Sequence, residues 1–169
     1  MVEWERARSR GMALNALEKA LTDLRRRHGE LYANVGAGVM WAAVLDENLR
    51  EDLGAEYEEL RDREVPLVHG LVHARNGVMH AALVTTNAGG ITAPIVAPVV
   101  IGPPSWRSSV VLHKLWTPKA LESARVRKRV AMYEEHLAGR DPADTFEEVL
   151  GFFRSLEAVG WKPSTLYRA

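Results

Sequence analysis

VPLVHGLVHARNGVMHAALVT, residues 65–85, is the stretch around which the chain is organised, and it holds three of the six histidines together with Arg75 and Asn76. Apolar residues recur along it every three or four positions, which is the pattern of an amphipathic helix. Pro66 suits the first turn of such a helix, because the N–H that proline lacks has no helical partner there. Asn87, Gly89 and Gly90 tolerate positive φ and mark its end. We therefore expect one helix over about residues 65–86.

The predicted helix has two different faces. At about 100° per residue, one stripe is apolar and contains Leu67, Leu71, Ala74, Val78, Ala81 and Ala82. The opposite stripe contains His69, His73, Asn76 and His80, with apolar neighbours at Val68, Val72, Met79 and Leu83. We therefore expect the histidine face to point away from the helix's own core and to meet another chain or a ligand.

Within this helix, Arg75, Asn76 and His80, five positions after the arginine, resemble the signature of the HEPN superfamily. HEPN domains are small α-helical domains, and many act as metal-independent ribonucleases, toxins or antiviral effectors with the motif paired across a homodimer. The resemblance implies that residues 1–169 form a single HEPN-like domain that cleaves RNA without a metal or cofactor. It also implies a homodimer through the motif helix and an antitoxin or other protein partner. GLVHARNGVMH and the later YEEHLAGRDPADTFEEVLGFF resemble segments of uncharacterised actinobacterial proteins, which implies no activity.

The residue types of the motif suit RNA cleavage. Cleavage without a metal needs a base for the 2′-hydroxyl proton, a cation for the phosphorane oxygens and an acid for the leaving 5′-oxygen. His80 is the candidate base or acid, because an imidazole titrates near neutral pH. Arg75 would stabilise the phosphate with its planar guanidinium, and Asn76 would orient the phosphate or the histidine. His69 and His73, on the same face, are the candidate substrate-binding residues.

The spacing of the motif favours a dimer. Residues five apart on a helix differ by about 140° in direction, so Arg75 and His80 of one chain do not project side by side. A two-fold axis would bring Arg75 of one chain towards His80 of the other.

Three other functions remain open. The same scaffold would serve as a non-catalytic interaction or nucleotide-binding module, with the histidine face as its binding surface. His69 and His73 are four apart, as in zinc-binding pairs, and the acidic segment 46–64 would have to supply further metal ligands. The basic cluster of residues 125–129 would suit DNA binding, although a net charge of zero and the lack of a helix-turn-helix signature argue against it.

Composition bounds the class of protein. The chain has 169 residues, of which 47% are hydrophobic, so one domain with a sizeable core is expected. It has no cysteine, which excludes disulfides and favours the cytoplasm. We find no signal peptide pattern and no apolar run long enough to span a bilayer.

The remaining sequence predicts a mainly α fold, a bundle of about five helices. Helical patterns cover residues 3–28, 30–53 and 55–63 before the central helix, and a C-terminal helical pair covers 117–159. Between the fourth and fifth helices, residues 90–116 contain four prolines and many β-branched residues. These features predict a Pro-rich extended or short β insertion, with 110–116 as a candidate partner strand.

Some single residues carry their own predictions. Met12 belongs to the apolar stripe of the first helix, and Trp41 is expected in the core. Gly36 and Gly38 follow no strand, so close helix packing explains them better than a dinucleotide site. Thr145 is expected at an ordinary surface position.

Overall fold

The computed structural model describes residues 3–28, 30–78, 84–86, 104–108 and 123–162. His80, most of the predicted insertion with its candidate strand 110–116, and the helix start predicted at Thr117 lie outside the described residues.

The predicted mainly α fold is confirmed. The helices are α1 (Glu3–Arg25), α2 (Leu31–Leu53), α3 (Ala55–Glu64), α4 (Leu67–Val78), α6 (Ala124–His136) and α7 (Pro142–Ala158). Two short strands, β1 (Val84–Thr86) and β2 (Pro104–Trp106), lie between α4 and α6, where the extended insertion was expected.

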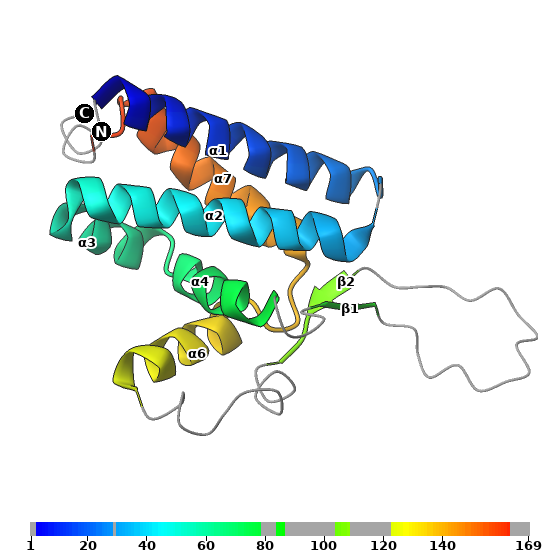
Figure 1. Ribbon diagram of the computed structural model, residues 1–169. Coiled ribbons are helices and arrows are strands. Elements are labelled where there is room, and N and C mark those ends of the chain that lie inside the picture. The colour runs from blue at the N-terminus through cyan, green and yellow to red at the C-terminus, as the bar shows by residue number, and fades with distance from the viewer. Residues whose placement is uncertain (1–2, 29, 79–83, 87–103, 109–122, 163–169) are drawn as a thin grey trace, which may run out of the picture.

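The helices form two adjoining groups (Figure 1). α1 and α2 run antiparallel and pack along their length, and α7 packs against α1. α4 lies on the other side of α2 and is itself covered by α6. The central helix therefore has a helix of the same chain on each of two sides.

A single apolar core joins the helices. Its largest fully buried side chains come from every part of the bundle and include Leu14, Leu45, Leu71, Tyr133, Phe146 and Phe153. Gly38 of α2 allows a close approach, because a Cβ there would lie 2.5 Å from Cε2 of Phe146. The interpretation of this glycine as a packing residue is confirmed. Gly54, with φ of 56°, ends α2 in a backbone conformation that side chains with a Cβ rarely adopt.

The central helix is shorter than predicted. α4 ends at Val78, and residues 84–86, which were assigned to the helix, form β1 instead. β1 pairs antiparallel with β2, with Val84 opposite Trp106 and Thr86 opposite Pro104. Val84, Thr85 and Thr86 are all β-branched, so their stiff side chains favour an extended backbone once a partner strand is present.

Trp106 packs this small sheet against α7. Its ring is 1% exposed and lies edge-on to Phe146, with ring centroids 5.8 Å apart. Its indole Nε1–H donates to Oγ1 of Thr145 at 3.0 Å, and that hydroxyl donates to the carbonyl of Asp141. The surface position predicted for Thr145 is therefore wrong, because a β-branched hydroxyl at the start of a helix can satisfy a buried indole.

The start of α7 agrees with the sequence. Asp141 is the N-cap, and its Oδ1 accepts a hydrogen bond of 2.8 Å from the backbone N–H of Ala143. Pro142 occupies the first helical position, where its missing N–H costs nothing.

Two apolar predictions for the first helices are wrong. Met12 is 64% exposed and Trp41 is 38% exposed, although both were assigned to the inner side of their helices. Ala13 and Leu14 take the inner face of α1, and Ala42 and Ala43 take that of α2. A helix turns by about 100° per residue, so these buried neighbours direct Met12 and Trp41 outwards.

Candidate functional site

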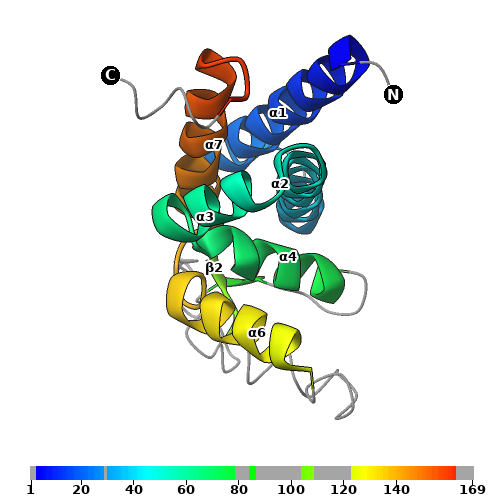
Figure 2. The same cartoon turned by 90° about the vertical axis from the view of Figure 1, so that its left-hand side faces the viewer.

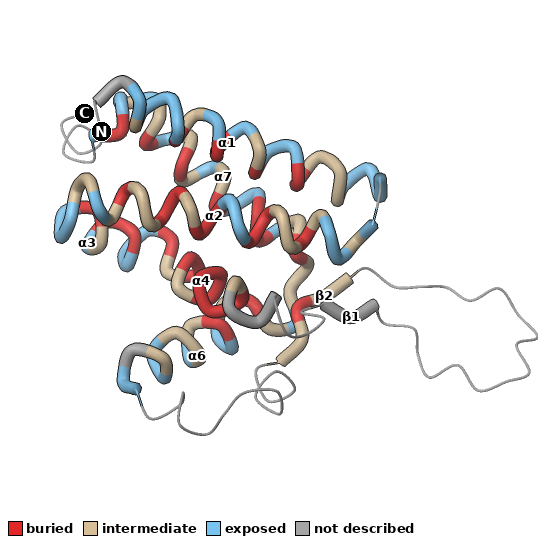
Figure 3. Tube along the Cα trace, viewed as in Figure 1, coloured by how far each residue is buried: buried red, intermediate tan, exposed pale blue. Residues whose placement is uncertain are grey.

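The described part of the histidine face of α4, at His73, is covered by α6 of the same chain. Gly70 lets the two helices approach closely, since a Cβ there would lie 3.0 Å from the Cα of Tyr133. His73 is 1% exposed and meets the Tyr133 ring edge-on, with centroids 5.6 Å apart. The expectation that this face points away from the chain's own core is therefore wrong for His73. Figure 3 shows the described part of α4 as mostly buried.

His69 belongs to a group of ion pairs at the start of α4. Its Nε2 lies 2.7 Å from Oδ1 of Asp62, which is on α3. The same carboxylate accepts hydrogen bonds from Arg61 at 2.9 Å and from Lys128 of α6 at 3.2 Å. One aspartate thus joins α3, α4 and α6. We use the name Asp46–His69 network for six residues: Asp46, Tyr57, Arg61, Asp62, His69 and Lys128.

The inner half of this network is buried. Asp46 of α2 is 3% exposed, and its Oδ1 accepts hydrogen bonds of 2.9 Å from both the Tyr57 hydroxyl and Nη1 of Arg61. Burial, reinforced by the neighbouring Asp46 carboxylate, raises the pKa of Tyr57 well above its usual value, so the phenol stays protonated. Burial opposes the charged form of Arg61, but Asp46 outweighs it and raises the pKa of the guanidinium.

In the outer half of the network, the pKa values of Asp62 and His69 are both lowered. Burial alone would raise the pKa of Asp62, but hydrogen bonds from His69 and Arg61 lower it to about 2. Burial, followed by the charge of Arg61, lowers the pKa of His69 despite its contact with Asp62. At neutral pH a neutral imidazole therefore donates its Nε2–H to a carboxylate.

The acidic segment 46–64 was expected to supply metal ligands if a metal site existed. Its one buried carboxylate, Asp46, instead accepts hydrogen bonds from Arg61 and Tyr57. Within the part of the chain that the structure describes, no group of three or more histidine, aspartate or glutamate residues is placed to hold a metal ion.

Arg75 lies at the other end of α4, in its last turn. Its Nη1 donates to Oε2 of Glu47 on α2 at 2.9 Å, and 25% of its side chain is exposed. Asn76 is in the same helix, but its side chain and the whole of His80 are not among the described residues. The structure therefore places one of the three candidate catalytic residues, and Glu47 is a neighbour that sequence reasoning missed. Only the packing of α2 on α4, which the sequence does not encode locally, brings Glu47 and Arg75 together.

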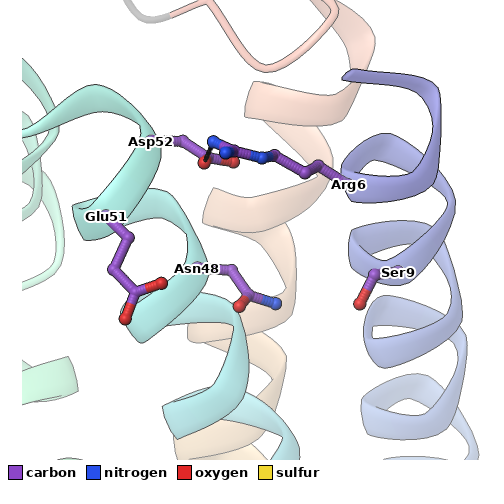
Figure 4. Close-up of a pocket in the computed structure, with 5 residues that line it drawn as sticks. All are labelled: Arg6, Ser9, Asn48, Glu51 and Asp52. Carbon is purple, nitrogen blue, oxygen red and sulfur yellow. Dashed lines mark hydrogen bonds and ion pairs between the residues drawn. The ribbon is translucent and has the colours of Figure 1, made fainter. Parts of the chain in front are cut away.

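A polar groove of about 280 Å³ lies elsewhere, between α1 and α2 (Figure 4). It is lined by Arg6, Ser9, Asn48, Glu51 and Asp52. Figure 4 shows Arg6 reaching across to Asp52 while Glu51 points away from that pair. Asp52 also pairs with Arg10, whose guanidinium lies over the Trp161 ring. The groove's central charges thus pair with each other, which joins α1 to α2.

The predicted DNA-binding cluster lies in α6, where Lys128 already binds Asp62.

No family model matches this chain, and no curated protein or solved structure matches it either. Among the described residues, no helix is long and apolar enough to cross a membrane.

Proposed function

We propose that this protein is a metal-independent endoribonuclease of the HEPN type that acts as a homodimer, as a toxin or defence effector. Arg75 stabilises the phosphate, His80 acts as the base or the acid, and Asn76 orients them. The 2′-oxygen of the RNA gives up its proton and bonds to phosphorus. The bond from phosphorus to the 5′-oxygen breaks, and that oxygen takes up a proton. The products are a cyclic phosphate and a 5′-hydroxyl.

One observation carries the proposal. Arg75 carries a guanidinium that is held in place and yet remains partly exposed: Glu47 accepts a hydrogen bond from its Nη1, and a quarter of the side chain is accessible. Its planar fork has other N–H groups with which to meet phosphate oxygens. Arg75 is therefore better placed to meet a polyanion than His73 in the covered middle of the helix.

His69 and His73 keep their substrate-binding role as a prediction only. A phosphate could contact only the exposed 12% of the His69 side chain. A phosphate would have to part α4 from α6 to reach His73, which is 1% exposed. We therefore place the chemistry at Arg75, Asn76 and His80.

The test is incubation of total RNA with purified protein in the presence of a chelator, followed on a gel. Wild type is expected to cleave, whereas Arg75→Ala and His80→Ala are expected to lose cleavage and keep the helical circular dichroism spectrum. Arg140→Ala is the matched control, because Arg140 also pairs with one glutamate, Glu148 at 2.8 Å, but lies between α6 and α7. It should cleave as wild type does. Full cleavage by folded Arg75→Ala would exclude Arg75 from the site.

The second candidate is a non-catalytic interaction module on the same scaffold. His69 and His73 bind Asp62 and pack on Tyr133, so the binding surface of such a module would lie away from the histidine face. A wild-type protein that leaves RNA intact in that assay, and also when divalent metal replaces the chelator, would overturn the first function and leave the second as the remaining candidate.

A further inference from the structure

Another cavity adjoins the polar groove between α1 and α2, at the end of the bundle where α1 begins and α7 ends (Figure 1). Its volume is about 260 Å³. Its lining includes Arg6, Arg10, Asp52, Leu53, Trp161 and Lys162. We call it the Arg10 cavity. The start of α1, the end of α2 and the turn after α7 meet there, although they are far apart in the sequence.

Positive charge is in excess around the Arg10 cavity. Asp52 is the one carboxylate among its described lining residues, whereas Arg6, Arg10 and Lys162 are cations. Asp52 accepts hydrogen bonds from Nη1 of Arg6 and from Nη1 of Arg10, so two guanidiniums share one negative charge. Glu51 lines the adjoining groove and points away from the Arg6–Asp52 pair (Figure 4). The arginine pair alone therefore carries one positive charge more than Asp52 neutralises.

Arg10 is the most enclosed of these cations. It is 7% exposed, and a buried guanidinium needs partners both for its charge and for its five N–H groups. Its Nη1 donates to Asp52, but its buried Nε has no hydrogen-bond partner among the described residues. Unsatisfied buried donors are rare in folded proteins, and a bound ion or water is one explanation for them. An anion in the cavity would supply the charge that Asp52 does not.

The turn after α7 holds the Arg10 guanidinium in one orientation. Trp161 has φ of 63°, a left-handed conformation that is rare for a bulky side chain. Its backbone N–H donates to the carbonyl of Leu156 at 2.7 Å, and the residue is 7% exposed. The guanidinium carbon of Arg10 lies 5.4 Å from the centroid of the Trp161 ring. The chain thus adopts an uncommon backbone conformation where the indole meets Arg10, and the cation is oriented before a ligand arrives.

We propose that the Arg10 cavity binds the phosphate group of a small organic phosphate ester. Arg6 and Arg10 are about one turn apart on α1, and Lys162 lines the cavity from the turn after α7. Donors from separate side chains suit the three oxygens of a phosphate monoester, whereas one guanidinium satisfies the two oxygens of a carboxylate. The group's charge of about −1.5 to −2 matches a site with excess positive charge. Leu53 and Trp161 offer apolar surface to the organic part, and the volume restricts that part to a few atoms.

This inference does not use the proposed function. Figure 2 shows α1 on one side of α2 and α4, which carries Arg75, on the other. The Arg10 cavity therefore lies apart from Arg75. A ligand that binds the start of α1, the end of α2 and the turn after α7 together should stabilise the folded chain, because it binds the native state alone.

The first test is isothermal titration calorimetry of the full chain with phenyl phosphate, in a phosphate-free buffer. Wild type should show one saturable site. Arg6→Gln should weaken binding by about 10-fold or more, because it removes a charged donor. Arg8→Gln is the matched control: it makes the same charge change on the same helix, but Arg8 is exposed and is not a lining residue of the cavity. Arg8→Gln should bind as wild type does.

A further variant keeps this test decisive if Arg6→Gln does not fold. Lys162→Gln leaves both arginine partners of Asp52 in place and should also weaken binding of phenyl phosphate. A wild type without saturable binding overturns the proposal. So does a folded Arg6→Gln or Lys162→Gln protein that binds as tightly as the Arg8→Gln control.

The second test identifies the chemistry of the ligand from the rise in melting temperature. Phenyl phosphate should raise it more than inorganic phosphate or benzoate at the same concentration. An equal rise with benzoate would overturn the assignment of a phosphate site, and an equal rise with inorganic phosphate would overturn the assignment of an organic ester. Neither test measures RNA cleavage, so the phosphate site and the nuclease can fail separately.

Discussion

The two ends of α4 hold positive and negative charges in different ways. At its start, the inner part of the Asp46–His69 network is enclosed, with Arg61 and Asp46 only 7% and 4% exposed, whereas Asp62 and Lys128 form its exposed rim. At its end, Arg75 and Glu47 form one pair with 25% and 41% of their side chains exposed. A buried group cannot exchange its partner for a ligand without opening the fold. The difference favours a structural role for the start of α4, and it is compatible with the proposal that the partly exposed Arg75 acts on a ligand.

Asp46 and Glu47 are neighbours in the sequence, so they offer the strongest test of this difference. Asp46→Ala would leave the buried Arg61 guanidinium without its carboxylate and should reduce the free energy of unfolding by about 3–5 kcal/mol. Glu47→Ala removes one side of a partly exposed pair and should cost about 1 kcal/mol or less. Urea denaturation of both variants measures the two losses. Equal losses would contradict the distinction between the two ends of the helix.

Two glycines test whether α6 really closes over the middle of α4. Gly70→Ala places a Cβ 2.8 Å from Leu137 and 3.0 Å from the Tyr133 backbone, so it should destabilise the protein by about 1–3 kcal/mol. Gly151→Ala, on the exposed side of α7, meets nothing within 4 Å and should stabilise it by about 0.5–1 kcal/mol. Thermal melting gives the sign of each change. A Gly70→Ala protein as stable as wild type would mean that the two helices do not touch there.

A smaller loss of stability is expected when the pH is lowered through the range in which His69 titrates. The pKa of His69 is lowered in the folded protein, so protonation favours the unfolded chain. This contribution to stability is complete above the usual imidazole pKa of 6.5 and is lost as the pH falls below it. Between about pH 7 and 5, His69→Gln should therefore lose less stability than wild type. Identical pH dependence of the two unfolding free energies would show that His69 is not enclosed.

The contribution of Asp62 to stability changes at a lower pH than that of His69. Its pKa is lowered to about 2, so its contribution is present above the ordinary value of 3.8 and disappears as the pH falls towards 2. With 40% of the Asp62 side chain exposed, solvent screening limits this contribution to about 1 kcal/mol. Asp62→Asn should remove the stability change in that lower range and leave the one near neutral pH. Equilibrium unfolding across the acid range separates the two.

Local signals were predicted well from the sequence. The helix predicted over 30–53 matches α2 (Leu31–Leu53), because such a boundary depends on a few adjacent residues. Gly38 was rightly interpreted as a packing residue. These features need no knowledge of which helix lies beside which.

Features that depend on neighbours in space were not predicted. Periodicity showed that α4 has two faces, but it could not show that α6 covers the second one and encloses His73. Thr145 looked like a surface residue because its buried partner, Trp106, is 39 positions away. Glu47 was missed for the same reason, since it meets Arg75 only when α2 packs on α4. The end of α4 was misplaced because Val84 and its neighbours suit a strand only once β2 is beside them.

The most direct test of the central claim is the RNA cleavage rate of Arg75→Ala relative to wild type, measured in chelator with enzyme in excess over a single-stranded RNA. Loss of a guanidinium that stabilises the phosphorane should slow cleavage by about 100-fold or more, while the unfolding free energy changes by about 1 kcal/mol or less. Arg75→Lys should recover part of the rate, because it restores charge without the planar fork. An unchanged rate in folded Arg75→Ala would contradict the proposed active site at Arg75.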